Sequence, residues 1–238
     1  MSLLEIRDLT SGHGDVPAVH DVSLRVEAGE MVALLGANGA GKTTTLHTIA
    51  GLLPTMAGEI LLDGTTISGL APHKVSRLGL SLLPQDRGIF FQLTVAENLR
   101  LHQRSESEVK VDEIVGYFPA LSELMSRKAG LLSGGEQQML ALGCRIIAGP
   151  RLLLIDEMSL GLAPIIFKRM LPVLAQISID KGIGVLLVEQ HVHLALKTSS
   201  RAYVLNRGRV TFDGSAVELA ARPEFLETSY LGHSSDQA

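Results

Sequence analysis

A glycine-rich segment at residues 36–44, GANGAGKTT, has the residue types and the spacing of a phosphate-binding loop. It matches the pattern G-x-x-x-x-G-K-[ST] and lies between an apolar run and a helical pattern, as the motif requires. In such a loop the backbone N–H groups and the helix N-terminus bind phosphates, Lys42 reaches the β- and γ-phosphates, and the Thr43 hydroxyl is a Mg²⁺ ligand. The predicted nucleotide-binding residues here are Gly36, Ala37, Asn38, Gly39, Ala40, Gly41, Lys42, Thr43 and Thr44.

Two adjacent acids, Asp156 and Glu157, end the apolar run LLLI at residues 152–155. Neighbouring side chains of a strand point to opposite faces, but both can reach one site where the chain turns at the end of the strand. Asp156 is therefore predicted to bind Mg²⁺ and Glu157 to polarise an attacking water. A turn carrying two solvated acids is the alternative, and the phosphate loop in the same chain favours the catalytic interpretation.

The segment LLSGGEQQML, residues 131–140, combines a helix start with two glycines. Ser133 and Glu136 have the spacing of a capping box, which predicts a helix from this point. Glycine costs up to about 1 kcal/mol relative to alanine within a helix, so Gly134 and Gly135 are not explained by the cap. They predict that another group comes very close to this backbone.

Short apolar runs alternate with helical patterns along the chain, which is typical of an α/β domain. The runs LLLI and VLLV are apolar throughout, as expected of parallel strands buried on both faces. Strands are predicted at residues 3–9, 22–26, 31–35, 58–62, 152–155, 185–188 and 202–210. Helices are predicted after Gly41 and at 94–102, 107–116, 133–148, 164–180 and 191–199.

In order and over almost the whole chain, the phosphate loop, LSGGEQQ, LLLIDE and SLGL resemble the motifs of ATP-binding-cassette (ABC) ATPases. The segments DEMSLGLAPI, LLVEQH and YLG make the chain most similar to ATPase subunits of branched-chain amino-acid importers. The resemblance implies an α/β fold, with a P-loop NTPase core, an antiparallel β subdomain and a helical subdomain at about 86–148. It implies one domain over residues 1–232 and a C-terminal tail at 233–238.

The same resemblance implies a site that two chains share. Two ABC ATPase domains meet head to tail in this family, and the SGG turn of one holds the ATP bound by the other. Gln85 would contact Mg²⁺ or the water as a catalytic and metal-binding residue, the alternative being a polar turn residue after Pro84. The resemblance also implies which residues contact the ATP bound by the partner: Ser133, Gly134, Gly135 and Gln137.

Other positions depart from the family pattern or leave two interpretations open. His13 takes the place of an aromatic residue that stacks on adenine and Val19 would contact the base, unless His13 is an ordinary exposed loop residue. Gln190 stands where the family has its switch histidine, so it is predicted as catalytic, with His191 as the alternative. Met158 replaces a usual proline, which predicts a looser loop after Glu157.

The surroundings of three further side chains, Cys144, Phe90 and Phe91, are also predicted. Cys144 replaces an arginine and is predicted to be a buried apolar residue rather than a reactive thiol. Phe90 and Phe91 either line a groove for a permease or belong to the core of the helical subdomain.

Composition limits the classes of partner and compartment. A net charge of −4 argues against a broad nucleic-acid-binding face, and one cysteine excludes an internal disulfide framework. The charged N-terminus argues against a secretory signal, and the chain has no apolar run long enough to span a membrane. The eight histidines show no metal-ligand spacing. The predicted location is cytoplasmic, peripheral on the inner face of the plasma membrane through permease subunits.

The sequence therefore predicts an ATP- and Mg²⁺-dependent ATPase that couples energy to an ABC importer for branched-chain amino acids. Its expected partners are a second ABC ATPase subunit, identical or different, two transmembrane permeases and, indirectly, an extracytoplasmic solute-binding protein. A urea, amide or other amino-acid importer and a weakly hydrolysing regulatory module are the alternatives. Two rival classes are disfavoured: soluble ABC ATPases of DNA repair or translation carry two cassettes or long coiled coils, and LSGGEQQ argues against a P-loop kinase.

Overall fold

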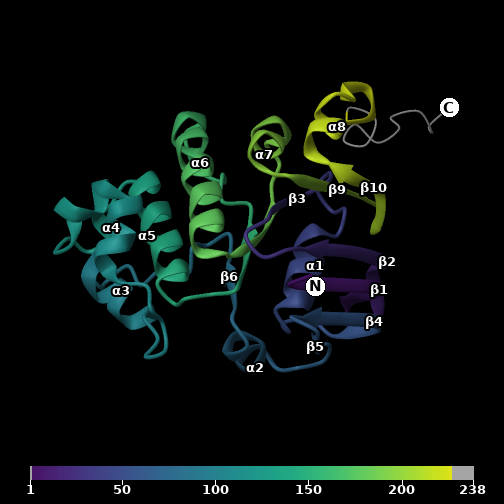
Figure 1. Cartoon of the computed structure of the whole chain (residues 1–238), viewed down its shortest axis with the longest axis horizontal. Helices are drawn as coiled ribbons and strands as arrows, with labels where there is room; N and C mark the ends of the chain where they lie inside the picture. Colours follow the sequence, from purple (N-terminus) through teal and green to yellow (C-terminus); the bar gives the residue numbers. More distant parts are fainter. Residues whose placement is uncertain (1, 227–238) are drawn as a thin grey trace.

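The computed structural model describes residues 2–226, which form two β-sheets and a set of helices (Figure 1). The strands are β1 (Leu4–His13), β2 (Val16–Val26), β3 (Met31–Leu35), β4 (Thr55–Leu62), β5 (Thr65–Thr66), β6 (Leu80–Leu83), β7 (Leu152–Asp156), β8 (Gly184–Val188), β9 (Arg201–Asn206) and β10 (Arg209–Ser215). The helices are α1 (Lys42–Ile49), α2 (Pro72–Arg77), α3 (Val95–His102), α4 (Val111–Tyr117), α5 (Gly134–Ile146), α6 (Pro164–Lys181), α7 (Val192–Thr198) and α8 (Ala216–Ala220), with 3₁₀ turns η1 (Pro119–Leu124) and η2 (Ala129–Leu131).

The larger sheet has the strand order β10-β9-β3-β8-β7-β6, and all its strands except β10 run parallel. Every residue of β3, β7 and β8 is buried, because helices or the second sheet cover both faces. The carboxyl ends of β3, β8, β7 and β6 lie along one edge of this sheet. Segments far apart in the sequence therefore converge at that edge.

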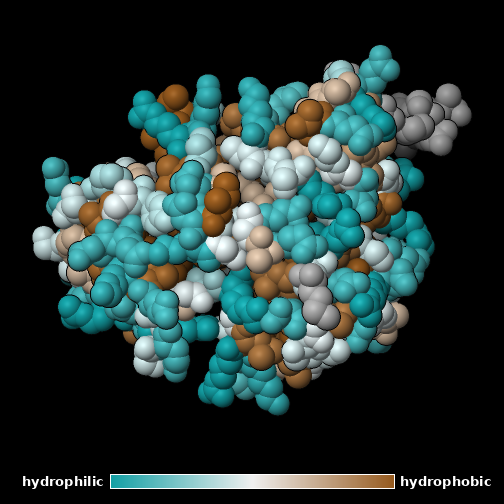
Figure 2. Space-filling model, viewed as in Figure 1, coloured by the Kyte–Doolittle hydropathy of each residue, from teal (hydrophilic) through white to brown (hydrophobic). Residues whose placement is uncertain are grey.

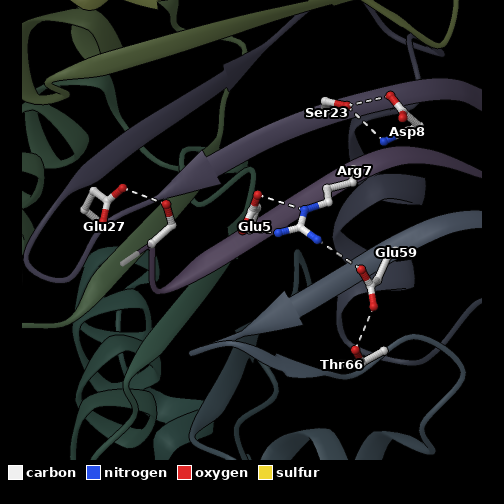
Figure 3. A network of polar contacts seen from close by, with 8 residues as sticks. Glu5, Arg7, Asp8, Ser23, Glu27, Glu59 and Thr66 are labelled. Atoms are coloured by element: carbon white, nitrogen blue, oxygen red, sulfur yellow. Dashed lines mark hydrogen bonds and ion pairs between the residues drawn. The ribbon is translucent and has the colours of Figure 1, made fainter.

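The smaller sheet is antiparallel, with the order β2-β1-β4-β5. Helix α1 packs between it and the larger sheet, where Leu46 and Ile49 join one of two apolar cores. The outer face of this sheet carries polar pairs (Figure 3), including Arg7 with Glu5 and Glu59. These pairs are exposed to solvent, so they contribute solubility more than stability.

The segment predicted as a helical subdomain contains α3, α4, η1, η2 and α5, and it lies on the far side of the larger sheet from the antiparallel sheet (Figure 1). The second apolar core joins this segment to β7 and α6 through buried residues such as Leu99, Leu140 and Ile155. The α/β fold with a phosphate-loop core and an antiparallel β subdomain is confirmed.

Several elements of the structure differ from the prediction or have no counterpart in it, the two-residue strand β5 among them. The strand predicted at 202–210 is a hairpin, because Arg207 and Gly208 have positive φ angles and turn the chain between β9 and β10. Strand β6 was not predicted, since its four residues carry no long apolar run. Helices α2 and α8 were also not predicted, and both are very short.

Figure 2 shows hydrophilic side chains over most of one face, with apolar side chains in small separate groups. Among the described residues, no helix is both long enough and apolar enough to span a lipid bilayer. The YLG ending and the tail predicted at 233–238 lie outside the described residues.

Candidate nucleotide-binding and catalytic site

The phosphate loop connects β3 to α1 and depends on glycine at two positions. A Cβ on Gly36 would lie 2.3 Å from the carbonyl oxygen of Leu205, and one on Gly41 would lie 2.4 Å from Cγ1 of Val19. Gly41 also has a φ of 103°, which side chains disfavour. No side chain caps α1, so its first N–H groups are available to an anionic ligand.

Lys42 is buried inside this loop, with 4% of its surface exposed. Its ammonium donates to the carbonyl oxygens of Gly36 at 2.9 Å and Ala37 at 3.1 Å, and it lies 3.9 Å from Oε1 of Glu157. Burial lowers the pKa of Lys42, and the nearby carboxylates, Glu157 foremost, oppose that shift. A bound phosphate would favour the charged ammonium in the same way.

The three predicted Mg²⁺ ligands, Thr43, Gln85 and Asp156, come from different segments of the chain and lie together. The Thr43 hydroxyl donates to Oδ1 of Asp156 at 3.2 Å, and the Gln85 amide donates to Oδ2 at 3.4 Å. Burial raises the pKa of Asp156, and its hydrogen bonds from Thr43 and Gln85 oppose that shift. A carboxylate, a hydroxyl and an amide are the oxygen-rich set that Mg²⁺ prefers, so these residues fit the ion.

Glu157 reaches the same site through an unusual backbone conformation. Its φ is 50°, a left-handed value that costs a residue other than glycine about 1–2 kcal/mol. Its N–H donates to the carbonyl oxygen of Val188 at 3.0 Å, which ties the end of β7 to the end of β8. This turn places the carboxylates of Asp156 and Glu157 on one side of the sheet edge.

These residues surround a cavity of about 330 Å³ at the carboxyl edge of the larger sheet. Strand β2, the loop after β3, the start of α1, the loop after β6, the residue after β7 and the segment after β8 all contribute to it. It is lined by Ala18, Asn38, Gly39, Gly41, Lys42, Thr43, Thr44, Gln85, Glu157 and Gln190. An adjoining cavity is lined by Gly36, Ala37, Asn38 and Gln190, and Ala40 is buried behind the loop.

The SGG turn stands apart from this cavity. Ser133 caps α5 and forms the predicted capping box with Glu136, through bonds of 2.7 Å and 3.4 Å. Ser133, Gly134 and Gly135 do not line the cavity formed by Lys42 and Glu157. One chain therefore presents the two halves of the predicted site in separate places.

Gln137, predicted to contact the partner's nucleotide, is engaged within its own chain. Its Oε1 accepts from Nη1 of Arg87 at 2.5 Å, and its Nε2 donates to the carbonyl oxygens of Ala129 and Leu132. Arg87 also donates to Gln138 at 3.2 Å. The Gln137 contact with nucleotide thus stays a prediction. The hydrogen bonds of Arg87, which connect the loop after β6 to α5, have no counterpart in the sequence prediction.

The structure places the two predicted adenine contacts differently. His13 is exposed at the end of β1 and does not line the cavity, so its stacking role stays a prediction. Val19 has no exposed surface, because its side chain packs beneath Gly41, and its contact with the base stays a prediction. The preceding residue, Ala18, faces the cavity instead, because neighbouring residues of a strand point to opposite faces.

Gln190 and His191 lie in different surroundings. Gln190 lines both cavities beside the phosphate loop. The His191 ring lies 5.7 Å from the ring of Phe167 in α6 and takes the first position before α7. The geometry thus favours Gln190 over His191 as the residue facing a γ-phosphate.

Replacing Gln190 by alanine is expected to lower the steady-state ATPase rate more than replacing His191 by alanine. The glutamine amide can hydrogen-bond a phosphate oxygen from the cavity, whereas the imidazole packs on Phe167. Loss of one such hydrogen bond predicts a reduction of about tenfold for Gln190→Ala. The reverse ranking, measured on proteins with equal thermal stability, would contradict this assignment.

The structure also places Cys144, the pair Phe90 and Phe91, and the loop after Glu157. Cys144 is fully buried, and burial raises the pKa of its thiol to about 12, which confirms an inert apolar role. Phe90 and Phe91 are 53% and 48% exposed, so their alternative assignment to the core was wrong. Met158 is buried and the next residue, Ser159, is hydrogen-bonded to Glu189, so the start of the loop after Glu157 is anchored, and a looser loop beyond it stays a prediction.

Comparison with known proteins agrees with this geometry. A family model described as ABC transporter matches residues 19–159. The high-affinity branched-chain amino acid transport ATP-binding protein BraG of Pseudomonas aeruginosa is 39% identical, over 97% of this chain and 100% of its own. A probable branched-chain amino acid transport ATP-binding protein LivF of Archaeoglobus fulgidus is 37% identical, over 94% and 96% of the two chains.

A solved structure of an ATP-binding subunit of an ABC transporter superposes with a TM-score of 0.79 and is 30% identical, over 94% of this chain and 93% of that one. The matched family region contains both the phosphate loop and the acidic pair of the cavity. The chain belongs to the ABC transporter family, as one of its ATP-binding proteins.

Proposed function

We propose that this chain binds ATP with Mg²⁺, hydrolyses it in a head-to-tail pair of ABC ATPase domains, and thereby drives import of branched-chain amino acids. The observation that carries the proposal is that Lys42, Thr43, Gln85 and Glu157 line one cavity, with Asp156 hydrogen-bonded to Thr43 and Gln85. The names of the two relatives support the substrate class, since both relatives match nearly the full chain.

The residues divide the chemistry between them. Lys42 and the N–H groups at the start of α1 bind the phosphates. Thr43, Asp156 and Gln85 would hold Mg²⁺, which supplies positive charge against the β- and γ-phosphates. The Glu157 carboxylate accepts a hydrogen bond from the attacking water and orients it toward the γ-phosphorus.

Completion of the site requires a second ATPase subunit, because the SGG turn lies outside the cavity of its own chain. Ser133 and the N–H groups of Gly134 and Gly135 would bind the γ-phosphate held by that subunit. Closing and reopening of the pair would move two permeases, and an extracytoplasmic solute-binding protein would deliver the substrate to them. This places the chain at the inner face of the membrane, docked on permeases.

The docking surface for the permeases is proposed at Phe90 and Phe91. Both rings are exposed on the loop that follows Gln85, and buried Asn98 fixes that loop through two hydrogen bonds to the backbone of Phe90. Leu131 is exposed beside them, since the N–H of Gly130 donates to the carbonyl oxygen of Phe91. Movement of Gln85 at the nucleotide would thus reach the permeases over a short length of chain.

Transport is tested by producing the chain with the permeases and the solute-binding protein of a branched-chain amino-acid importer, in cells that lack branched-chain uptake. Labelled leucine, isoleucine and valine are expected to accumulate only when the chain is present. Lys42→Ala should abolish that uptake, because it removes the buried cation of the phosphate loop.

A panel of labelled urea, short amides and other amino acids serves as the comparison. Uptake of one of these in place of leucine would reject the proposed substrate. Weak Mg²⁺-dependent ATPase activity of the purified chain without uptake of any solute would reject the transport role and favour the weakly hydrolysing regulatory module.

A further inference from the structure

A buried carboxylate, Glu189, lies one residue after β8 and has no role in the chemistry described above. It is 0% exposed and does not line the nucleotide cavity, so it touches neither ATP nor water there. Burying a carboxylate is costly unless hydrogen bonds compensate, and the five residues of β8 before it are apolar or glycine. Its presence therefore requires an explanation other than packing.

Glu189 accepts hydrogen bonds from two segments on either side of the cavity. Its Oε1 accepts from the N–H of Ser159 at 3.1 Å, and its Oε2 accepts from the Ser159 hydroxyl at 2.6 Å. Oε2 also accepts from the N–H of Gln190 at 3.3 Å. Burial raises the pKa of Glu189 to about 7, and the bonds from Ser159 oppose that shift. One side chain thus joins the turn after Glu157 to the residue that faces the phosphate loop.

The turn that Glu189 holds needs such a restraint. Glu157 has a left-handed backbone that it does not favour on its own, and the residue after it is methionine rather than a rigid proline. Further along the same loop, the carbonyl oxygen of Gly161 lies 3.6 Å from the Cβ position of Gly134. A shift of Ser159 would therefore move both the general base Glu157 and the loop segment at Gly161, which lies beside the SGG turn.

We infer that Glu189, through Ser159, is a positioning residue that holds Glu157, Gln190 and the loop beside Gly134 in one fixed arrangement. The inference rests on the proposed hydrolysis, and it adds a residue pair that acts through its neighbours. Because neither residue touches the nucleotide, loss of the pair should reduce turnover while leaving nucleotide affinity unchanged.

The test compares Ser159→Ala with a matched serine. Ser178 is also buried and its hydroxyl donates to the carbonyl oxygen of Ile183 at 2.7 Å, away from the cavity. Ser159→Ala is expected to lower kcat about tenfold or more, because small misplacement of catalytic groups is costly, with the Kd for a non-hydrolysable ATP analogue within about twofold of the parent. Ser178→Ala is expected to lower thermal stability by a similar amount and to keep the parental kcat.

Two further variants separate positioning from stability. Ser159→Thr retains a hydroxyl and should restore most of the lost turnover. Glu189→Gln removes the charge and should lower kcat, and its combination with Ser159→Ala should lower kcat by much less than the product of the two single effects.

The outcomes are distinct. A parental kcat in folded Ser159→Ala and Glu189→Gln would overturn the inference, as would an equal loss in Ser178→Ala. A weakened analogue Kd at an unchanged kcat would also overturn it, since the pair would then support nucleotide binding rather than the placement of Glu157. Absence of ATPase activity in the parent protein would instead contradict the proposed function.

Discussion

Glutamine in place of Glu157 is expected to lower the kcat of ATP hydrolysis by about 10² to 10⁴-fold, the range typical of a general base. The amide has nearly the shape of the carboxylate but cannot accept a proton from the attacking water. Nucleotide affinity should not fall, because Lys42, Thr43 and Asp156 remain, and Lys42 loses a competing carboxylate 3.9 Å away. Phosphate release measured at saturating Mg²⁺–ATP checks the rate, and analogue binding checks the affinity.

Glu218→Gln provides the matched control. Glu218 is exposed on α8, where it pairs with Arg222 one helical turn away. Its replacement should leave kcat unchanged, since exposed pairs of this kind contribute little even to stability. Hydrolysis at the parental rate by Glu157→Gln would mean that another group activates the water. Light scattering should also show that Glu157→Gln still pairs in ATP, because its nucleotide site is intact.

Short-range motifs were the part of the site that the sequence predicted well. The phosphate loop and the acidic pair each occupy a few consecutive residues, and the elements around them, β3, α1 and β7, match the predicted runs closely. The sequence also predicted that Asp156 and Glu157 can reach one site where the chain turns at the end of the strand. The structure adds the means, a positive φ at Glu157 that periodicity cannot reveal.

The orientation of side chains and the ends of strands were harder to predict, because they change with a shift of one residue in register. Val19 and Ala18 are neighbours on β2, and the sequence does not say which of them faces the cavity, because both are apolar. The apolar pattern predicts one strand at 202–210 where the structure has the hairpin of β9 and β10, although the segment NRG at 206–208 is typical of a tight turn. Strand β6 is four residues long, yet it delivers Gln85 to the site.

Contacts between distant segments outside the family motifs could not be predicted. Ser159 and Glu189 are thirty residues apart in the chain, and their bond exists only because β7 and β8 are adjacent strands. The one local signal was a charged residue directly after a buried run, in LLVEQ. Arg87 and Gln137 are fifty residues apart, and neither lies in an apolar pattern that would place it.

The two glycines of the SGG turn have different explanations. A Cβ on Gly135 would lie 2.9 Å from Cγ2 of Ile166, so contacts within the chain already disfavour a side chain there. A Cβ on Gly134 would have its nearest neighbour at 3.6 Å, which is ordinary contact. Nothing within one described chain therefore excludes alanine at Gly134, and the close approach inferred from the sequence has to come from outside the chain.

Gly134→Ala is expected to fold at least as stably as the parent and to impair ATP-driven pairing. Alanine is favoured over glycine in a helix by up to about 1 kcal/mol, so thermal stability should not fall. The added methyl would occupy the space of a phosphate held by the second subunit, which should weaken pairing and kcat by about tenfold or more. Gly134→Asp should have a larger effect, because its charge repels the triphosphate although the first turn of a helix favours an acid.

Gly116→Ala is the control for this pair of variants. Gly116 lies in α4, and a Cβ there would meet nothing within 4 Å, so its replacement should raise stability without changing pairing. Pairing is measured by light scattering with ATP in the Glu157→Gln background, where the nucleotide persists. If Gly134→Asp paired as readily as Gly116→Ala, the second subunit's triphosphate could not lie against this helix start, and the shared site would have to be placed elsewhere on the chain.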